Sequence, residues 1–198
     1  GLRGFDKVIW KAEKQPGDSS LKLTYVSKDG EEGYPGTLST EVIYTLTAAN
    51  ELKIEYAAFT DKPTPVNLTN HCYFNLSGGT DSTILGHELM LNAAKFTEVN
   101  EVLIPTGKLP GVSGTPMDFT NAKPIGKEIK AVKGGYDHNW VLNKNKTEPE
   151  FAGSLYHPGS GRLMEVFTTE PGIQFYSGNF LDGTLQHTRN SQKYIKHA

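Results

Sequence analysis

One short run, residues 67–78 (NLTNHCYFNLSG), gathers amides, hydroxyls, an imidazole and aromatic rings that could do chemistry together. We expect this run to form the end of a β-strand, where alternate side chains point to the same face. That face would carry Asn67, Thr69, His71 and Tyr73. Buried polar groups need hydrogen-bond partners, so a core face is a poor place for such a set. A face that receives a hydroxyl-rich ligand suits it better, with a solvated polar ladder as the plainer alternative.

Four further blocks accompany this run in order along the chain. They are residues 4–10 (GFDKVIW), 27–36 (SKDGEEGYPG), 135–140 (GYDHNW) and 169–179 (TEPGIQFYSGN). Together with residues 67–78, the blocks resemble the aldose 1-epimerase, or galactose mutarotase, family in order and spacing over nearly the whole chain. The resemblance implies a broad, twisted antiparallel β-sandwich with its sugar site on a concave sheet face.

The resemblance also implies a reaction and roles for five residues. Mutarotation opens a cyclic hemiacetal and closes it on the other face of C1, so it needs an acid and a base. By resemblance, His71 is the acid that protonates the ring oxygen, a role that suits histidine. Asp137 and Gln174 would bind sugar hydroxyls, and Tyr73 would help to wall the site. Cys72 lies in the same block; alternation points its thiol away, so it would contact substrate through its backbone. Neither a metal nor a cofactor is implied.

The base is expected outside this sequence. In the family it is a glutamate on a strand downstream of the glutamine block, and the chain ends at Ala198 before that strand. Glu170 is the nearest acidic candidate, but its position predicts a solvated turn. The family's upstream histidine and arginine would precede Gly1. We therefore expect an interior piece of the domain, truncated at both ends, with severely impaired catalysis and poor solubility on its own.

Composition excludes several classes of protein. The 198 residues carry 20 Lys+Arg against 22 Asp+Glu, so no global field attracts nucleic acid or anionic membranes. No long apolar run or charged leader is visible. The single cysteine excludes an internal disulfide and favours a reducing compartment, so we predict a cytoplasmic location. The expected partner is a small hexose; the oligomeric state is left open.

The distribution of Gly and Pro is typical of an all-β protein: 21 Gly and 11 Pro divide short alternating segments. The expected strands are residues 21–26, 42–47, 52–56, 88–91, 139–142, 163–168 and 173–177. Residues 48–51 are predicted to form a hairpin connection, residues 105–127 a long ordered loop over one rim, and residues 143–149 a solvated turn. We predict one domain over residues 1–198, a large but incomplete antiparallel β-sandwich.

Other chemistry is weakly signalled. His87 and Glu88 begin like a zinc-binding helix, but Leu91 occupies the second histidine position and the segment favours a strand. His157 lies in loop-like sequence with no evident partner. Two further functions remain open: a non-catalytic carbohydrate-binding or interaction module of the same fold, and an epimerase of hexose 6-phosphates. The second would need an arginine cluster, whereas the only arginines are Arg3, Arg162 and Arg189.

Overall fold

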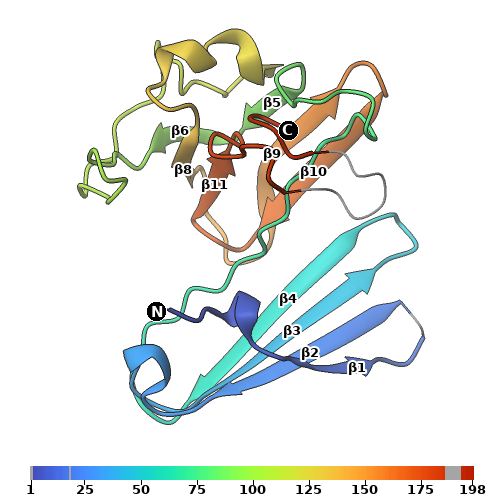
Figure 1. The fold of residues 1–198 in the computed structure, drawn as a ribbon, viewed down its shortest axis with the longest axis vertical. Coiled ribbons are helices and arrows are strands. Elements are labelled where there is room, and N and C mark those ends of the chain that lie inside the picture. Colours follow the sequence, from blue (N-terminus) through green and yellow to red (C-terminus); the bar gives the residue numbers. More distant parts are fainter. Residues whose placement is uncertain (1, 18, 186–192) are drawn as a thin grey trace. The chain divides into compact units, whose positions relative to one another are not determined.

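The computed structural model describes residues 2–17, 19–185 and 193–198 and shows an all-β protein in which every paired strand is antiparallel (Figure 1). The prediction of an all-β antiparallel fold is confirmed. The chain divides into two compact units, Gly1–Cys72 and Tyr73–Ala198. The single domain expected over residues 1–198 stays a prediction.

The first unit is a four-stranded sheet of order β1-β2-β3-β4. Its strands are β1 (Lys11–Lys14), β2 (Ser20–Ser27), β3 (Leu38–Leu46) and β4 (Leu52–Thr60), with two 3₁₀ turns, η1 (Phe5–Lys7) and η2 (Glu31–Gly33). The predicted hairpin connects β3 to β4. Asn50 takes a positive φ of 62° there, and the Glu51 carbonyl accepts the Thr47 amide at 2.9 Å. Asn tolerates this left-handed backbone better than most residues.

The two faces of this sheet differ as alternation requires. Val42 and Tyr44 share one face with Ile54 and Tyr56, their cross-strand partners on β4. The opposite face carries charged side chains, among them the ion pair of Lys22 with Glu41. The sheet therefore has one largely apolar face and one polar face.

The second unit contains two sheets, of order β10-β9-β5-β7 and β11-β8-β6. Their strands are β5 (Glu88–Leu91), β6 (Ala93–Phe96), β7 (Lys123–Pro124), β8 (Asp137–Leu142), β9 (Glu150–His157), β10 (Arg162–Thr168) and β11 (Gly172–Tyr176). Two 3₁₀ turns, η3 (Ile125–Lys127) and η4 (Ile129–Ala131), precede β8. The predictions of strands at residues 88–91, 139–142, 163–168 and 173–177 are confirmed to within two residues by β5, β8, β10 and β11, whereas β6, β7 and β9 were not predicted.

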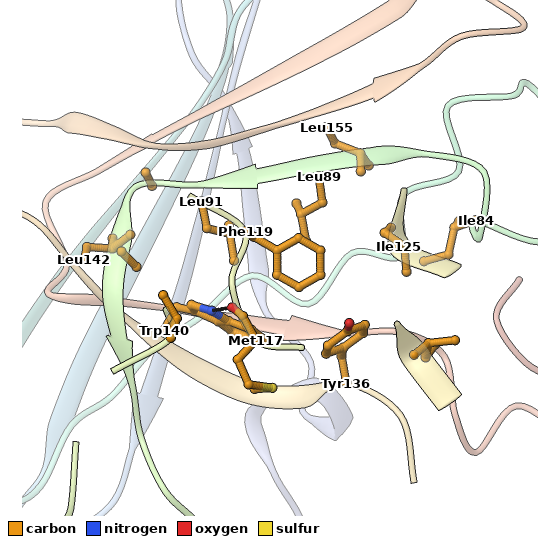
Figure 2. Packing of buried hydrophobic residues seen from close by; sticks show 14 residues of the cluster. Ile84, Leu89, Leu91, Met117, Phe119, Ile125, Tyr136, Trp140, Leu142 and Leu155 are labelled. Atoms are coloured by element: carbon orange, nitrogen blue, oxygen red, sulfur yellow. Dashed lines mark hydrogen bonds between the residues drawn. The ribbon is translucent and has the colours of Figure 1, made fainter. Parts of the chain in front are cut away.

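Both sheets contribute to one hydrophobic core. Leu89 and Leu155 come from one sheet and Trp140 from the other, with the Phe119 ring placed among them (Figure 2). Phe119 belongs to the long segment 105–127, which is ordered and largely irregular as predicted. It also supplies core side chains rather than only covering a rim. The carbonyl of Met117 in that segment accepts the indole N–H of Trp140 at 3.0 Å, so the loop satisfies the one polar atom of the buried tryptophan.

The prediction that residues 67–78 form a strand is wrong. Residues 67–75 form neither helix nor strand, and a turn begins at Leu76. A strand needs a neighbour to accept and donate its backbone hydrogen bonds, and no described strand pairs with this run. Pro63 and Pro65 just ahead of it also remove two backbone donors. Alternation therefore does not determine which way the side chains of this run point.

Among the described residues, no helix has the length and apolar character needed to cross a bilayer.

Candidate active site

Asp137 and Gln174 form the centre of the candidate site, on adjacent strands β8 and β11. Tyr176 pairs with Asp137 and Gln174 with Asn139, so all four residues lie on one face of the sheet. The Gln174 side-chain amide donates from Nε2 to Asp137 Oδ1 at 2.9 Å. Asp137 is half-buried and Gln174 is exposed. The bond uses one of the two Asp137 oxygens and the amide donor side of Gln174, so further hydroxyls can bind to this pair.

The polar surface continues across β8 towards the residue after β6. Thr97 donates its backbone amide to the Asn139 carbonyl at 2.8 Å, and its hydroxyl lies 3.2 Å from Asn139 Oδ1. A cavity of about 280 Å³ opens here, near the lower end of the roughly 300–1,000 Å³ range of ligand pockets. It is lined by Thr97, Val99, Leu103, Pro105, Asp137, His138, Asn139 and Gln174. The lining combines hydroxyl-binding groups with an apolar wall, which suits a small polyol.

An aromatic side chain lies beside this polar pair. The Tyr73 ring centroid is 6.0 Å from that of Tyr176, with the planes tilted by 55°, and Tyr73 remains 49% exposed. Burial raises the pKa of the Tyr73 phenol, and the nearby Tyr176 and Asp137 raise it further. Tyr73 is therefore held as a neutral phenol, which can donate a hydrogen bond and present a ring face to a sugar.

His138 supports Asp137 from the backbone side. Its Nδ1 accepts the Asp137 amide at 3.1 Å, so this nitrogen carries no proton in that arrangement. Burial lowers the pKa of His138, while the charge of Asp137 partly opposes that shift. A neutral His138 thus fixes the start of β8, the strand that carries the carboxylate.

His71 and Cys72 are the last two residues of the first unit, and both are exposed. Asn70 donates its side-chain amide to the Tyr44 hydroxyl at 3.4 Å. Burial raises the pKa of Tyr56, and Tyr44 and Cys72 raise it further. Asn70 and Cys72 therefore lie near the largely apolar face of the four-stranded sheet.

Of the five residues predicted for the site, the structure brings Tyr73, Asp137 and Gln174 together within the second unit. His71 and Cys72 are placed with the first unit. Glu170 is exposed in the turn between β10 and β11, where its amide donates to Thr168 Oγ1 at 3.1 Å. The prediction of a solvated turn residue is confirmed.

Three residues of this surface were missed from the sequence: Thr97, Asn139 and Tyr176. Strand alternation could have found two of them, since Asn139 shares a face with Asp137 and Tyr176 shares one with Gln174. Nothing in the local sequence marked Thr97, whose place depends on pairing with a strand 42 residues away. In the part of the chain that the structure describes, no three His, Cys, Asp or Glu side chains are arranged to hold a metal ion.

A model of the family described as aldose 1-epimerase matches residues 1–198. The chain belongs to the aldose 1-epimerase family. The family match covers all five sequence blocks. Asp137 lies in the block of residues 135–140, and Gln174 lies in the block of residues 169–179.

Relatives in this family are close. The galactose mutarotases of Sus scrofa and Homo sapiens are 46% and 45% identical to it over 199 residues, which cover the whole chain and 57% of each relative. The aldose 1-epimerase of Escherichia coli is 41% identical over 190 residues, or 93% of the chain and 54% of that protein. The chain thus spans somewhat more than half the length of these relatives.

Solved structures agree with the fold. A GalM/aldose epimerase homologue from C. elegans superimposes with a TM-score of 0.82 at 26% identity, over 95% of this chain and 56% of that one. The galactose 1-epimerase of Lactobacillus acidophilus gives a TM-score of 0.79 at 28% identity, over 96% and 57%. The aldose epimerase fold is therefore supported by sequence and by structure.

Proposed function

We propose that this chain belongs to an enzyme that interconverts the α- and β-anomers of hexoses such as galactose and glucose. The anomeric hydroxyl loses a proton as the ring C1–O bond breaks and the ring oxygen gains one. Rotation about the C1–C2 bond then lets the ring close on the other carbonyl face, with both protons returned. No oxidant, metal or cofactor is needed for this balance, and each acid–base step contributes about 10²–10⁴-fold.

The observation that carries the proposal is the Asp137–Gln174 hydrogen bond on the exposed face of β8 and β11. Asp137 would accept hydrogen bonds from one or two sugar hydroxyls. Gln174 would offer its carbonyl as an acceptor, and Tyr73 would cover one side of the ring. A carboxylate and an amide held together in this way can bind neighbouring hydroxyl groups on one sugar.

His71 is proposed as the acid that protonates the ring oxygen. One residue separates it from Tyr73, so the two Cα atoms can be no more than about 7 Å apart. The match of residues 67–78 to the family pattern, and the family match over residues 1–198, support this role for His71. Cys72, which lies between His71 and Tyr73, would contact the sugar through its backbone.

We also propose that the protein acts in the cytoplasm.

Polarimetry of freshly dissolved α-galactose tests the proposal. The intact protein should speed the change in rotation, and His71→Ala should lower kcat at least about 100-fold through loss of the acid. Added imidazole should restore part of that rate. Lys53→Ala on β4, which removes an exposed ion pair with Glu55, is the control and should leave the rate unchanged. An undiminished rate in His71→Ala would show that another group is the acid.

Measurements on the same protein can distinguish the epimerase from the alternative, a non-catalytic carbohydrate-binding module. Calorimetry would then detect galactose binding that Asp137→Ala weakens, while polarimetry would show no rate above the buffer. Binding together with a rate supports the epimerase, and binding without one supports the module.

A further inference from the structure

Two histidines lie stacked inside the second unit, away from the Asp137–Gln174 pair. His87, just before β5, is 0% exposed, and His157, at the end of β9, is 4% exposed. Their ring centroids are 4.6 Å apart with planes inclined by 34°. They are neighbours because β5 pairs with β9 through Glu88 and Tyr156. Two imidazoles this close in a buried site strongly disfavour a second positive charge.

His87 acts as a hydrogen-bond acceptor. Its Nε2 accepts the backbone amide of Leu76 at 2.9 Å, so the proton of the neutral ring lies on Nδ1. Nδ1 is buried and has no hydrogen-bond partner among the described residues. A proton added at Nε2 would face the Leu76 N–H, and two donors cannot bond. Protonation of His87 and its bond to Leu76 are therefore mutually exclusive.

His157 binds Asp81, five residues after Leu76 in the chain. Its Nδ1 accepts the Ser160 amide at 3.1 Å, which leaves Nε2–H to donate to Asp81 Oδ2 at 2.9 Å. Leu76 is also held through its carbonyl, which accepts from Ser160 Oγ at 2.8 Å and from Arg162 Nη1 at 2.9 Å. Residues 75–81, called here the anchored turn, are thus fixed at both ends.

The anchored turn is braced internally as well. Asn75 accepts the Ser77 amide at 3.0 Å and donates to the Asp81 carbonyl at 3.1 Å. The Ser77 hydroxyl accepts the amides of Gly79 and Asp81 at 3.2 and 3.1 Å. These bonds hold residues 75–81 in one conformation, and the bonds of Leu76 to His87 and of Asp81 to His157 attach the turn to the residue before β5 and to the end of β9.

The turn continues the run that carries Tyr73. Two residues, Phe74 and Asn75, lie between Tyr73 and Leu76, and residues 67–75 belong to no described strand. Among the contacts between described residues, Leu76 is the first position after Tyr73 whose backbone N–H and C=O are both bonded. Where Leu76 is fixed determines where the Tyr73 ring can lie relative to Tyr176 and Gln174.

We propose that His87 and His157 are positioning residues, neutral imidazoles that hold the anchored turn and through it place Tyr73 beside the Asp137–Gln174 pair, and that acid releases the turn. The effect on turnover rests on the proposed epimerase function; the effect on the turn does not.

Burial and the charged groups around His87 and His157 determine how the stability of the anchored turn changes with pH. Burial lowers the pKa of His87, the neighbouring His157 lowers it further, and Asp81 opposes them. Arg162 on β10 adds a fixed positive charge bound to the Leu76 carbonyl, and Glu88 follows His87 in β5. Lys123 on β7 is paired with Glu128. A lowered pKa means that the unfolded chain binds the proton more readily than the folded one. The contribution of neutral His87 to the stability of the folded state is therefore complete above the ordinary histidine pKa of about 6.5, and it declines as the pH falls below that value.

Two substitutions at His87 test the proposal. In His87→Gln, the side-chain carbonyl can accept the Leu76 amide but does not titrate. In His87→Leu, the acceptor is lost at a similar volume. Hydrogen exchange of the peptide spanning residues 75–81, corrected for the intrinsic rate at each pH, reports on the turn without any sugar. Polarimetry between about pH 5 and pH 8 reports on turnover.

We expect the wild-type turn to be protected at neutral pH and to lose protection reversibly in acid, with kcat falling over the same range. His87→Gln should keep protection and kcat within about threefold at neutral pH and lose the acid response. His87→Leu should lose protection at every pH and about tenfold or more in kcat. An acid response in His87→Gln equal to that of the wild type overturns the proposal, even if His87→Leu fails to fold. If the wild type shows no mutarotation, the epimerase function fails, and the exchange data alone decide on the turn.

Discussion

The two faces of the β11-β8-β6 sheet place neighbouring residues of the same strands in opposite environments. Asp137 and Gln174 lie on the outer face, where they bond each other and remain at least partly accessible. Trp140 and Phe175 lie on the inner face, with ring centroids 6.1 Å apart in the core. Because alternation separates the two sets within a few residues, stability and sugar binding should respond to different substitutions.

The contrast has an energetic basis. A buried aromatic side chain removes about 150–250 Å² from water, at roughly 25 cal/mol per Å² of apolar area. An accessible hydrogen bond contributes much less to folding, because water replaces it when the chain unfolds. The inner face should therefore dominate stability, and the outer face should keep its hydrogen-bonding groups for a ligand.

The largest effect is expected for Trp140→Ala. The side chain is 0% exposed and its indole bonds the Met117 carbonyl, so the variant leaves both a cavity and an unpaired acceptor. We expect a loss of about 3–5 kcal/mol in the free energy of unfolding, measured by urea denaturation. Trp140→Phe is the matched control and should lose less. A loss below about 1 kcal/mol would mean that the inner face is not the main source of stability.

Asp137→Ala should show the opposite pattern. Hydrogen bonds to a charged group contribute about 1.5–3 kcal/mol, so galactose affinity and kcat/KM should fall roughly 10- to 150-fold. The urea midpoint should change little, because the carboxylate is only half-buried. Asp137→Asn, which keeps an acceptor of the same shape, should lose less. Calorimetry and polarimetry on the same samples check this, and a large drop in stability without a loss of affinity would contradict the division between faces.

Much of the fold could be predicted from local pattern. Residues 42–47, 52–56 and 173–177 alternate clearly, and the structure places β3, β4 and β11 there. Alternation works because each of these strands has one face in a core. It failed for residues 67–78, since composition can suggest a strand but does not supply a partner for its backbone.

The site was predictable to the extent that the family resemblance marked it. Asp137, Gln174 and Tyr73 came from matched blocks, and the structure places them together. The pair of His87 and His157 could not be found this way. His157 was expected in a loop without a partner, yet it ends β9 and bonds an aspartate 76 residues away. Contacts at that separation depend on topology, which local sequence does not encode.

Gln174→Ala provides the finest test of the outer face. A hydrogen bond between neutral groups contributes about 0.5–1.5 kcal/mol, so kcat/KM for galactose should fall only about two- to tenfold by polarimetry. Gln174→Glu should lose more although it is nearly isosteric, because a second carboxylate would lie where the amide now donates to Asp137 at 2.9 Å, and like charges repel. If the two variants lost equally, the amide would serve only as a spacer. A greater loss in the glutamate variant, with the urea midpoint unchanged in the alanine variant, would show that Gln174 orients the carboxylate for the sugar.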